Sequence, residues 1–274
     1  MDQATKAQQY VLGHSEAELA RLEHQAQIFG AETREVLRRA GIAPGMRVLD
    51  IGCGVGDVSL IAADMVGPSG RVLGIDNAAA ALSSARARAA RGGYGWLDFE
   101  EANIYGYRTS KTFDAVIGRF ILMHVPDPVA VVKAAIRFSK PAGIIAFVEM
   151  DISESSTVPE LPMMTQCVDW IVQTYRKVGV EPNMGAQLHR TFRAAGLTPR
   201  LHGTCRIESG SDAVVYEFAG QALLTLMPAI EAHGIATAAE VDPATMANRL
   251  REASAAGDHC LFLPRLVGAW ATVA

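Results

Sequence analysis

The sequence predicts an α/β protein with a doubly wound, mainly parallel sheet of seven strands, an N-terminal helical lobe and a helical insertion before the last strand. From Met46 onward, short apolar runs alternate with helical segments, which is typical of parallel strands joined by right-handed crossovers. The stretches before and after this zone have mainly helical patterns. A chain of 274 residues has room for one such domain and a modest extra lobe.

Residues 1–42 have the spacing of helices. Ser15 can cap a first helix, in which apolar side chains recur near helical spacing at Leu19, Leu22 and Ile28. A second helical run, 32–40, ends at Gly41. We therefore expect an N-terminal lobe of helices, followed by a main domain over residues 43–274.

The central zone contains five units of strand and helix. Its strand candidates lie at 47–51, 71–75, 96–101, 113–118 and 143–149. Helices are predicted between them, at 56–65, 78–91 and 127–138. The turn Lys140-Pro141-Ala142-Gly143 cannot continue a helix and ends the last of these.

The chain after Asp151 adds the remaining elements. These are helices at about 160–178 and 184–195, a strand near 200–207, a mainly helical stretch at 211–256 and a final strand-like stretch at 260–273. Additions at one end of a sheet vary while the scaffold stays fixed, and ligands bind at that end. We expect helical substrate-cap segments at about 151–195 and 208–258.

The composition favours a folded cytoplasmic protein, with half of the residues hydrophobic and 20% charged. A net charge of −4 without a basic block argues against a nucleic-acid partner. The polar start lacks a signal-peptide pattern, and no apolar run approaches the roughly 20 residues of a membrane span. Four distant cysteines are expected as free thiols, and no metal site is expected. The oligomeric state stays open, with a homodimer as one option.

A glycine-rich turn, Asp50-Ile51-Gly52-Cys53-Gly54-Val55-Gly56, lies between a buried strand and a predicted helix. Glycines let the backbone approach a ligand closely, and the helix N-terminus offers unpaired N–H groups. A dinucleotide fingerprint starting at Gly52 needs a third glycine at position 57, where this chain has Asp57. The turn therefore predicts a bound cofactor, and the missing third glycine weakens the interpretation of that cofactor as a nicotinamide dinucleotide.

The order D-x-G-C-G-x-G resembles motif I of the class I S-adenosylmethionine-dependent methyltransferases, which have a Rossmann-like fold. The resemblance extends in order over residues 46–150. It implies S-adenosylmethionine as cofactor, held at the turn by Asp50, Gly52, Cys53 and Gly54. It also implies a small-molecule acceptor and a helical N-terminal lobe that closes over the site.

Further cofactor contacts are implied by the residues that follow the next three strands. Asp76 accepts from the ribose hydroxyls and Asn77 lies along the adenine. Asn103 stands where the family more often has Asp, and its amide oxygen can still accept from the adenine amine, while Ile104 donates its backbone N–H. Gly118 matches the position whose carbonyl faces the methionine end of the cofactor.

Arg119 comes directly after Gly118 and is expected to bind the cofactor carboxylate or a substrate anion, with a solvated arginine as the alternative. Alignment alone supplies most of the rate of methyl transfer, so one base at most is needed. His124 is the first candidate, with a packing or cofactor-orienting role as its alternative. Glu149 is the next candidate, unless it caps a turn. Tyr10 and His14 of the helical lobe are expected to face the acceptor.

The insertion and the segment before it supply apolar candidates for an acceptor pocket: Met163, Met164, Trp170, Leu223, Leu224, Leu226, Met227 and Ile230. They favour a partly hydrophobic acceptor, such as a natural product or a lipid-like metabolite of secondary metabolism, with O-, N- or C-methylation open. Two other functions stay open: a non-catalytic protein that binds S-adenosylmethionine, and a nicotinamide-dependent oxidoreductase.

Overall fold

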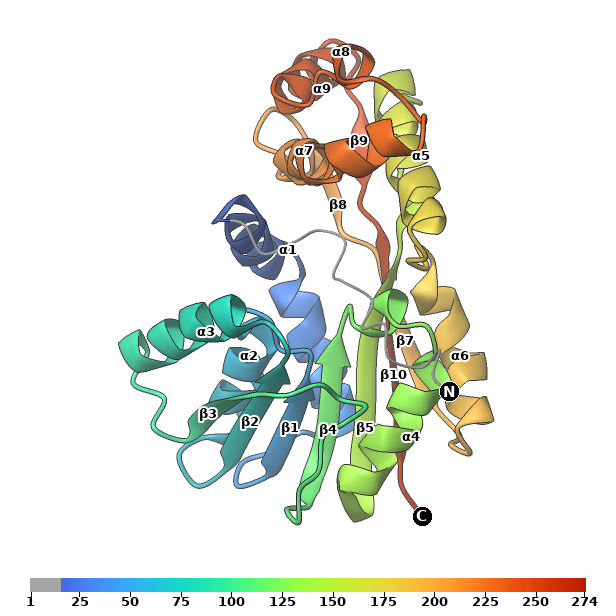
Figure 1. The fold of residues 1–274 in the computed structure, drawn as a ribbon. Helices are drawn as coiled ribbons and strands as arrows, with labels where there is room; N and C mark the ends of the chain where they lie inside the picture. The colour runs from blue at the N-terminus through green and yellow to red at the C-terminus, as the bar shows by residue number, and fades with distance from the viewer. Residues whose placement is uncertain (1–15) are drawn as a thin grey trace.

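The computed structural model describes the backbone of residues 16–274 and the side chains of residues 28–274. Within this range the main sheet has seven strands in the order β3-β2-β1-β4-β5-β10-β7 (Figure 1). Strand β10 runs antiparallel to both of its neighbours, β5 and β7, and the other pairings are parallel. The strands are β1 (Arg47–Ile51), β2 (Arg71–Asp76), β3 (Leu97–Glu101), β4 (Phe113–Arg119), β5 (Ser139–Asp151), β7 (Arg200–Thr204) and β10 (Arg265–Thr272). The predicted doubly wound, mainly parallel sheet is confirmed.

Helices cover both faces of this sheet. The helices are α1 (Glu16–Ala40), α2 (Asp57–Val66), α3 (Ala79–Arg91), α4 (Pro128–Phe138) and α6 (Met184–Ala194). Helix α1 packs on α2 and β10, where a Cβ on Gly268 would collide with Val36. Helix α6 packs on the opposite face, where Phe192 meets Phe147 edge to face. The two helical layers bury most of the central strands β1 and β4, which explains their continuous apolar runs, whereas the edge strand β3 is largely exposed.

The two helices expected in residues 1–42 form one continuous helix, α1, so that prediction is wrong. Gly30, in the middle of α1, costs about 1 kcal/mol relative to alanine, but burial on either side of it outweighs this cost. Ile28 and Phe29 before Gly30, and Val36 and Leu37 after it, are each 1% exposed. Ser15 lies outside the described residues.

The turn expected at 140–143 is present as an irregularity inside β5. Phe113 pairs with Ser139 and Ala115 with Ile144, so residues 140–143 bulge out of the ladder. Ala142 has a left-handed backbone (φ 59°), and its N–H donates to the carbonyl of Val273 at 3.1 Å. Helix α4 ends at Phe138, as the sequence predicts.

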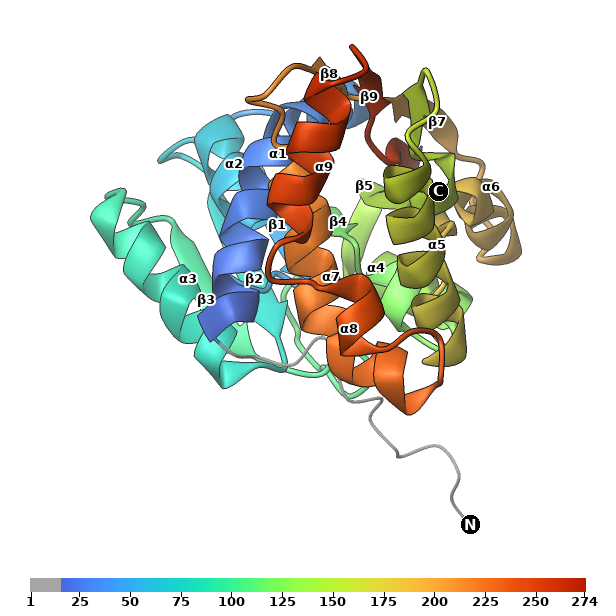
Figure 2. The same cartoon turned by 90° about the horizontal axis from the view of Figure 1, so that it is seen from above.

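A cap stands above the carboxyl ends of the strands (Figures 1 and 2). It contains a small sheet in the order β6-β9-β8 and helices that pack mainly on one another, with α5 also contacting β6. Its elements are β6 (Ser156–Val158), α5 (Pro162–Lys177), β8 (Ile207–Ser209), α7 (Val215–Ala232), α8 (Ala238–Val241), α9 (Met246–Ala255) and β9 (Cys260–Phe262). Two 3-10 turns, η1 (Leu122–His124) and η2 (Ile152–Glu154), follow β4 and β5.

Two stretches expected as single strands each divide between the main sheet and the cap. The stretch at 200–207 becomes β7 and the start of β8, and the stretch at 260–273 becomes β9 and β10. Pro264, which lacks a backbone donor, lies between β9 and β10. The cap is therefore attached to the sheet by short links. No helix within residues 16–274 has both the length and the apolar character of a membrane span.

Candidate active site

A cavity of about 910 Å³ lies between the carboxyl ends of the main sheet and the cap. One half is formed by the glycine turn after β1 and by the residues that follow β2, β3 and β4. The other half is formed by η2 and by α5, α7 and β9 of the cap. Ligands of open α/β sheets bind at this edge, where the strand order reverses. In the main sheet, the strand order reverses between the neighbouring strands β1 and β4.

The glycine turn has a backbone that other residues adopt only with strain. Gly52, Gly54 and Gly56 have φ values of 66°, 52° and 86°. A Cβ on Gly52 would lie 2.5 Å from Cδ1 of Ile121, whereas a Cβ on Gly54 would have no atom within 4 Å. The turn therefore packs tightly at Gly52 and opens into the cavity at Gly54. Gly52, Cys53 and Gly54 all line the cavity, as predicted for a cofactor cradle.

Asp76, at the end of β2, ties the second strand to the glycine turn. Its Oδ2 accepts from the N–H of Gly54 at 2.8 Å, and its Oδ1 accepts from the N–H of Ala78 at 2.9 Å. Each carboxylate oxygen can accept a further hydrogen bond. Asp76 and Asn77 both line the cavity. The carboxylate is thus held in place by the backbone with accepting capacity left for a ligand.

Asn103 forms a tight turn after β3. Its Oδ1 accepts from the N–H of Tyr105 at 3.0 Å, and its carbonyl accepts from the N–H of Gly106 at 3.0 Å. This local bonding fits asparagine as well as the commoner aspartate. Asn103, Ile104 and Tyr105 line the cavity together. Sequence reasoning found the first two and missed Tyr105.

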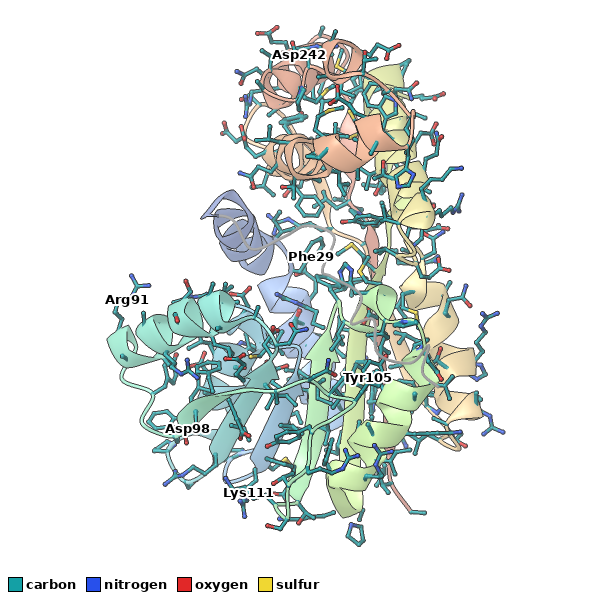
Figure 3. All side chains as sticks on the ribbon, in the orientation of Figure 1. Phe29, Arg91, Asp98, Tyr105, Lys111 and Asp242 are labelled. Atoms are coloured by element: carbon teal, nitrogen blue, oxygen red, sulfur yellow. The ribbon has the colours of Figure 1, made fainter. Side chains whose placement is uncertain are left out.

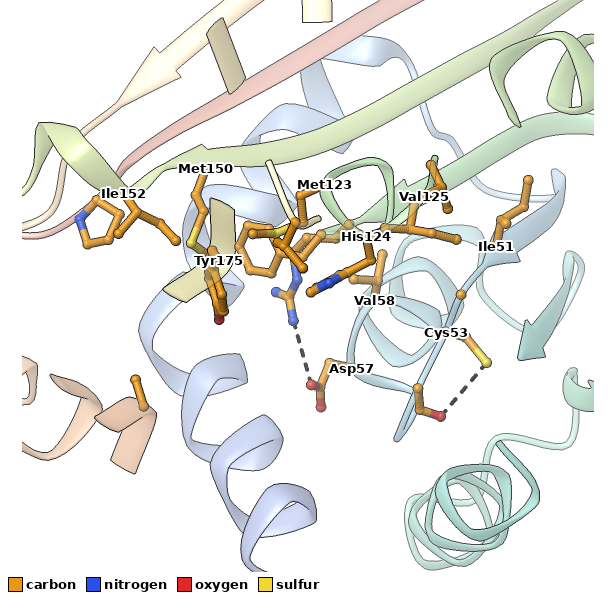
Figure 4. Close-up of a pocket in the computed structure, with 18 of the residues that line it drawn as sticks. Ile51, Cys53, Asp57, Val58, Met123, His124, Val125, Met150, Ile152 and Tyr175 are labelled. Carbon is orange, nitrogen blue, oxygen red and sulfur yellow. Dashed lines mark hydrogen bonds and ion pairs between the residues drawn. The ribbon is translucent and has the colours of Figure 1, made fainter. Parts of the chain in front are cut away.

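Arg119 is buried, so the alternative of a solvated side chain is excluded. Its Nη1 donates to Oγ1 of Thr33 on α1 at 3.1 Å, and its Nη2 lies 3.5 Å from Oδ2 of Asp57 (Figure 4). Arg88 of α3 holds the other oxygen of Asp57 at 2.5 Å. Burial lowers the pKa of Arg119 from its usual value, and the Asp57 carboxylate opposes that shift. The network connects α1, the cofactor turn and β4.

Two predicted cofactor residues do not line the cavity. Asp50 is 1% exposed beneath the turn, where its Oδ2 accepts from Oγ of Ser59 at 2.6 Å. Burial raises the pKa of Asp50 to about 7. Gly118 lies within β4, where a Cβ would meet Phe147 at 2.8 Å. Both residues lie within strands of the main sheet, outside the cavity lining.

The four catalytic candidates have different positions. His124 ends η1 and lines the cavity, and its backbone N–H donates to the carbonyl of Ile121 at 3.0 Å. Glu149 is fully buried and away from the cavity lining; its Oε1 accepts from the N–H groups of Ile121 (3.0 Å) and Leu122 (2.7 Å). Burial raises its pKa to about 8. Glu149 therefore supports the turn that ends at His124, so of its two expected roles the structure favours turn capping over catalysis. Tyr10 and His14 lie outside the described residues.

The acceptor wall differs from the expected one. Of the eight apolar candidates, only Met164 lines the cavity. Leu223, Leu226, Met227 and Ile230 are buried in the core, Leu224 is exposed, and Met163 and Trp170 pack around the core. The lining of the cap consists mainly of Met164, Val168, Ile171 and Tyr175 from α5, with Val215, Phe218, Ala219 and Ala222 from α7.

With this geometry, the chain matches the family described as "Methyltransferase domain" over residues 42–196. The chain belongs to this family. The resemblance to the class I S-adenosylmethionine-dependent methyltransferases is thus confirmed, and S-adenosylmethionine is the cofactor. The cavity fits this cofactor: the open side of Gly54 gives its backbone access, and the oriented Asp76 carboxylate can accept from a ribose.

Similar proteins include a demethylmenaquinone methyltransferase of Lactococcus lactis, 29% identical over 49% of this chain and 52% of that protein. A ubiquinone biosynthesis O-methyltransferase of Paracidovorax citrulli is 37% identical over 39% of this chain and 45% of that protein. This chain thus spans about half the length of the curated relatives it matches. The YcgJ protein of Bacillus subtilis has the same fold, with a TM-score of 0.59, 16% identity and coverage of 89% of this chain and 98% of that one.

Several residues that line the cavity are not predicted from the sequence. Asp57 and Val58 begin α2, and Phe120 and Ile121 follow β4. Phe120 has a left-handed backbone (φ 54°). Phe29 of α1, which is labelled in Figure 3, packs edge to face on both Phe120 and Phe218. The helical spacing of α5 and α7 shows that each has an apolar face, but α7 is apolar nearly all round. Spacing therefore could not select the face that lines the cavity.

Proposed function

We propose that this chain transfers the methyl group of S-adenosylmethionine to a small, partly hydrophobic acceptor of natural-product or lipid-like type. The observation that carries the proposal is one continuous cavity that joins the glycine turn and Asp76 to the apolar wall of the cap. The names of two relatives, which refer to demethylmenaquinone and ubiquinone biosynthesis, support an acceptor of this kind. The cofactor supplies an electrophilic methyl group on a positive sulfonium.

In this proposal the cofactor half binds and orients. Gly52 and Gly54 let the backbone come close, Asp76 accepts from the ribose hydroxyls, and Asn103 and Ile104 contact the adenine. Arg119, fixed by Thr33 and Asp57, lies between the two halves and takes the cofactor carboxylate. Correct alignment of the two reactants supplies most of the rate, with effective molarities of roughly 10⁵ M or more.

His124 is proposed to receive the proton of the acceptor, because it is the catalytic candidate that lines the cavity among the described residues. Glu149 positions His124 indirectly, since its carboxyl group holds the first two residues of the turn that ends at His124.

Residues 1–42 are proposed to act as a lid, and α1 already contacts both β5 and α7. Of the two expected cap segments, 151–195 and 208–258, the first includes α6, which packs on the main sheet. The cap proposed to select the acceptor therefore consists of η2, β6 and α5 from the first segment together with the second segment.

A transfer assay tests the proposal. Purified protein is incubated with S-adenosylmethionine labelled on its methyl group and with a panel of small hydroxylated and amino acceptors of graded hydrophobicity. We expect a labelled organic product together with an equal amount of S-adenosylhomocysteine, and Asp76→Ala should reduce both. Fractions of a cell extract are assayed as acceptors in the same way. Tight binding of S-adenosylhomocysteine without methyl transfer to the panel or to any fraction would support a non-catalytic protein. A thermal shift by NADH rather than by S-adenosylhomocysteine would support an oxidoreductase.

A further inference from the structure

The two halves of the cavity differ in charge. Among the described residues, the Asp, Glu, Lys and Arg side chains in its lining are Asp57, Asp76, Arg119 and Asp127. All four come from the sheet side: from helix and strand ends and from the loop after β4. The described lining from η2, the cap helices and β9 includes no Asp, Glu, Lys or Arg.

The cap half combines aromatic rings, thioethers and small side chains. Phe218 and Tyr175 line the cavity from α7 and α5, and Met164 of α5 adds a thioether, a group that makes favourable contacts with aromatic rings. Met150, near the end of β5 on the sheet side, adds a second thioether to the lining (Figure 4). On α7, Ala219 and Ala222 present only methyl groups on the lining face. The wall is therefore adapted to a flat or elongated apolar molecule that lies along α7.

The size of the cavity supports an acceptor of appreciable length. Pockets for a single drug-sized ligand have volumes of roughly 300–1,000 Å³. The cavity of about 910 Å³ has to contain both the cofactor and the acceptor. The cavity volume lies near the upper end of the range for one ligand, so the cofactor does not fill it. The cap half therefore has room for a small drug-sized molecule rather than for a few atoms.

The wall has few polar groups, and these are neutral hydroxyls. Ser155, Ser156 and Thr157 line the cavity where η2 meets β6, and Tyr175 adds a phenol. Such groups can pair with a hydroxyl or carbonyl of a ligand, but they cannot neutralise a full charge. An ammonium or carboxylate taken from water into such a wall without a counter-ion loses several kcal/mol. The wall therefore selects against charged acceptors.

Resting on the proposed function, we infer that the cap half is a subsite for an electrically neutral, apolar acceptor, of which a phenol or alcohol methylated on its oxygen is the simplest case. Aliphatic amines are cationic and carboxylic acids are anionic at neutral pH, whereas a hydroxyl is neutral until it reacts. In the reaction the hydroxyl proton passes to the imidazole of His124. The oxygen forms its bond to the methyl carbon as the carbon–sulfur bond breaks, and the electron pair of that bond stays on sulfur.

Three probes that share a 4-hexylphenyl group and differ in the charge of the head group test this subsite. The protein is saturated with S-adenosylhomocysteine, Nile red is added as a neutral dye, and its displacement is measured by 4-hexylphenol, 4-hexylbenzoate and 4-hexylbenzylamine at neutral pH. We expect the phenol to bind on the order of 100-fold more tightly than either charged probe. Equal or tighter binding of the amine or the carboxylate would overturn the inference.

A pair of variants on α7 tests the place of the subsite. Ala222→Phe fills the lining face, and Leu224→Phe changes the exposed face of the same helix, where Leu224 is 51% exposed. Ala222→Phe should weaken binding of 4-hexylphenol at least about tenfold through overpacking and leave the affinity for S-adenosylhomocysteine within about twofold of wild type. Leu224→Phe should change neither affinity. Unchanged phenol binding in Ala222→Phe would overturn the inference.

The controls separate this inference from the proposed function. Thermal melts show whether each variant is folded, and the three-probe series on the wild-type protein needs no variant. Failure of S-adenosylhomocysteine to bind the wild-type protein would contradict the proposed function itself. Normal binding of S-adenosylhomocysteine together with a preference for a charged probe would contradict only the neutral acceptor subsite.

Discussion

Removal of the Asp76 carboxylate is the perturbation whose effect can be worked out most completely. In the free protein this group accepts two backbone hydrogen bonds, from Gly54 at 2.8 Å and from Ala78 at 2.9 Å. Hydrogen bonds to charged groups contribute about 1.5–3 kcal/mol each. Asp76 is only half-buried, so water replaces part of this, and we expect Asp76→Ala to lower the free energy of unfolding by about 1–2 kcal/mol.

The effect on ligand binding should be larger. Two ribose hydroxyls that donate to the carboxylate contribute about 3 kcal/mol at the lower end of the same range, which corresponds to a loss of more than 100-fold in affinity. Isothermal titration with S-adenosylhomocysteine measures this loss directly. A thermal melt measures stability, with an expected drop of roughly 2–8 °C for a chain of this size.

Two further variants control the Asp76 experiment. Asp76→Asn keeps an oxygen acceptor without the charge and should have an intermediate affinity. Asp98→Ala removes an exposed carboxylate from the neighbouring strand β3, outside the cavity lining, and should leave the affinity unchanged. An Asp76→Ala protein that binds S-adenosylhomocysteine within threefold of wild type would refute the assignment of the ribose site.

Two more predictions concern the support of the site. Burial raises the pKa of Glu149 to about 8 from 4.5, so the folded protein keeps this proton at pH values where the unfolded chain has released it. The stability that this group contributes is complete below pH 4.5 and is lost as the pH rises to about 8, so Glu149→Gln should melt with a flatter pH dependence than wild type between about pH 5 and 8. Parallel melting curves over this range would contradict the prediction. Gly52→Ala should lose about 1–2 kcal/mol through left-handed strain, and it should also weaken binding of S-adenosylhomocysteine because the new methyl displaces Ile121. Gly93→Ala has the same strain (φ 70°) in open space, so it should lose stability without any change in titrated affinity; equal affinities of the two variants would argue against a special role of Gly52.

The cofactor half could be predicted from the sequence because its signals are local. A buried strand, a glycine turn and an acid at the end of the next strand lie within residues 47–76, and the structure joins Gly54 directly to Asp76. The strand boundaries also follow from local apolar runs. The resemblance extended these signals to Asn103 and Arg119, and both residues line the cavity.

The remaining differences depend on tertiary contacts that a sequence does not display. Helix α1 continues through Gly30 because buried side chains on either side outweigh the cost of the glycine. An acid at the end of a strand has the same sequence pattern whether it faces a ligand or caps a turn, which is why Glu149 was placed among the catalytic candidates. On α7, Ala222 lines the cavity while the adjacent Leu223 is in the core. Only the packing of the cap separates their roles.

The most direct test of the account is a crystal structure of the protein with bound S-adenosylhomocysteine. We expect the ribose hydroxyls within hydrogen-bonding distance of the Asp76 carboxylate, the adenine beside Asn103 and Ile104, and the sulfur facing the cap half near His124. A ligand bound away from the glycine turn, or a sulfur that faces away from the cap, would contradict the account.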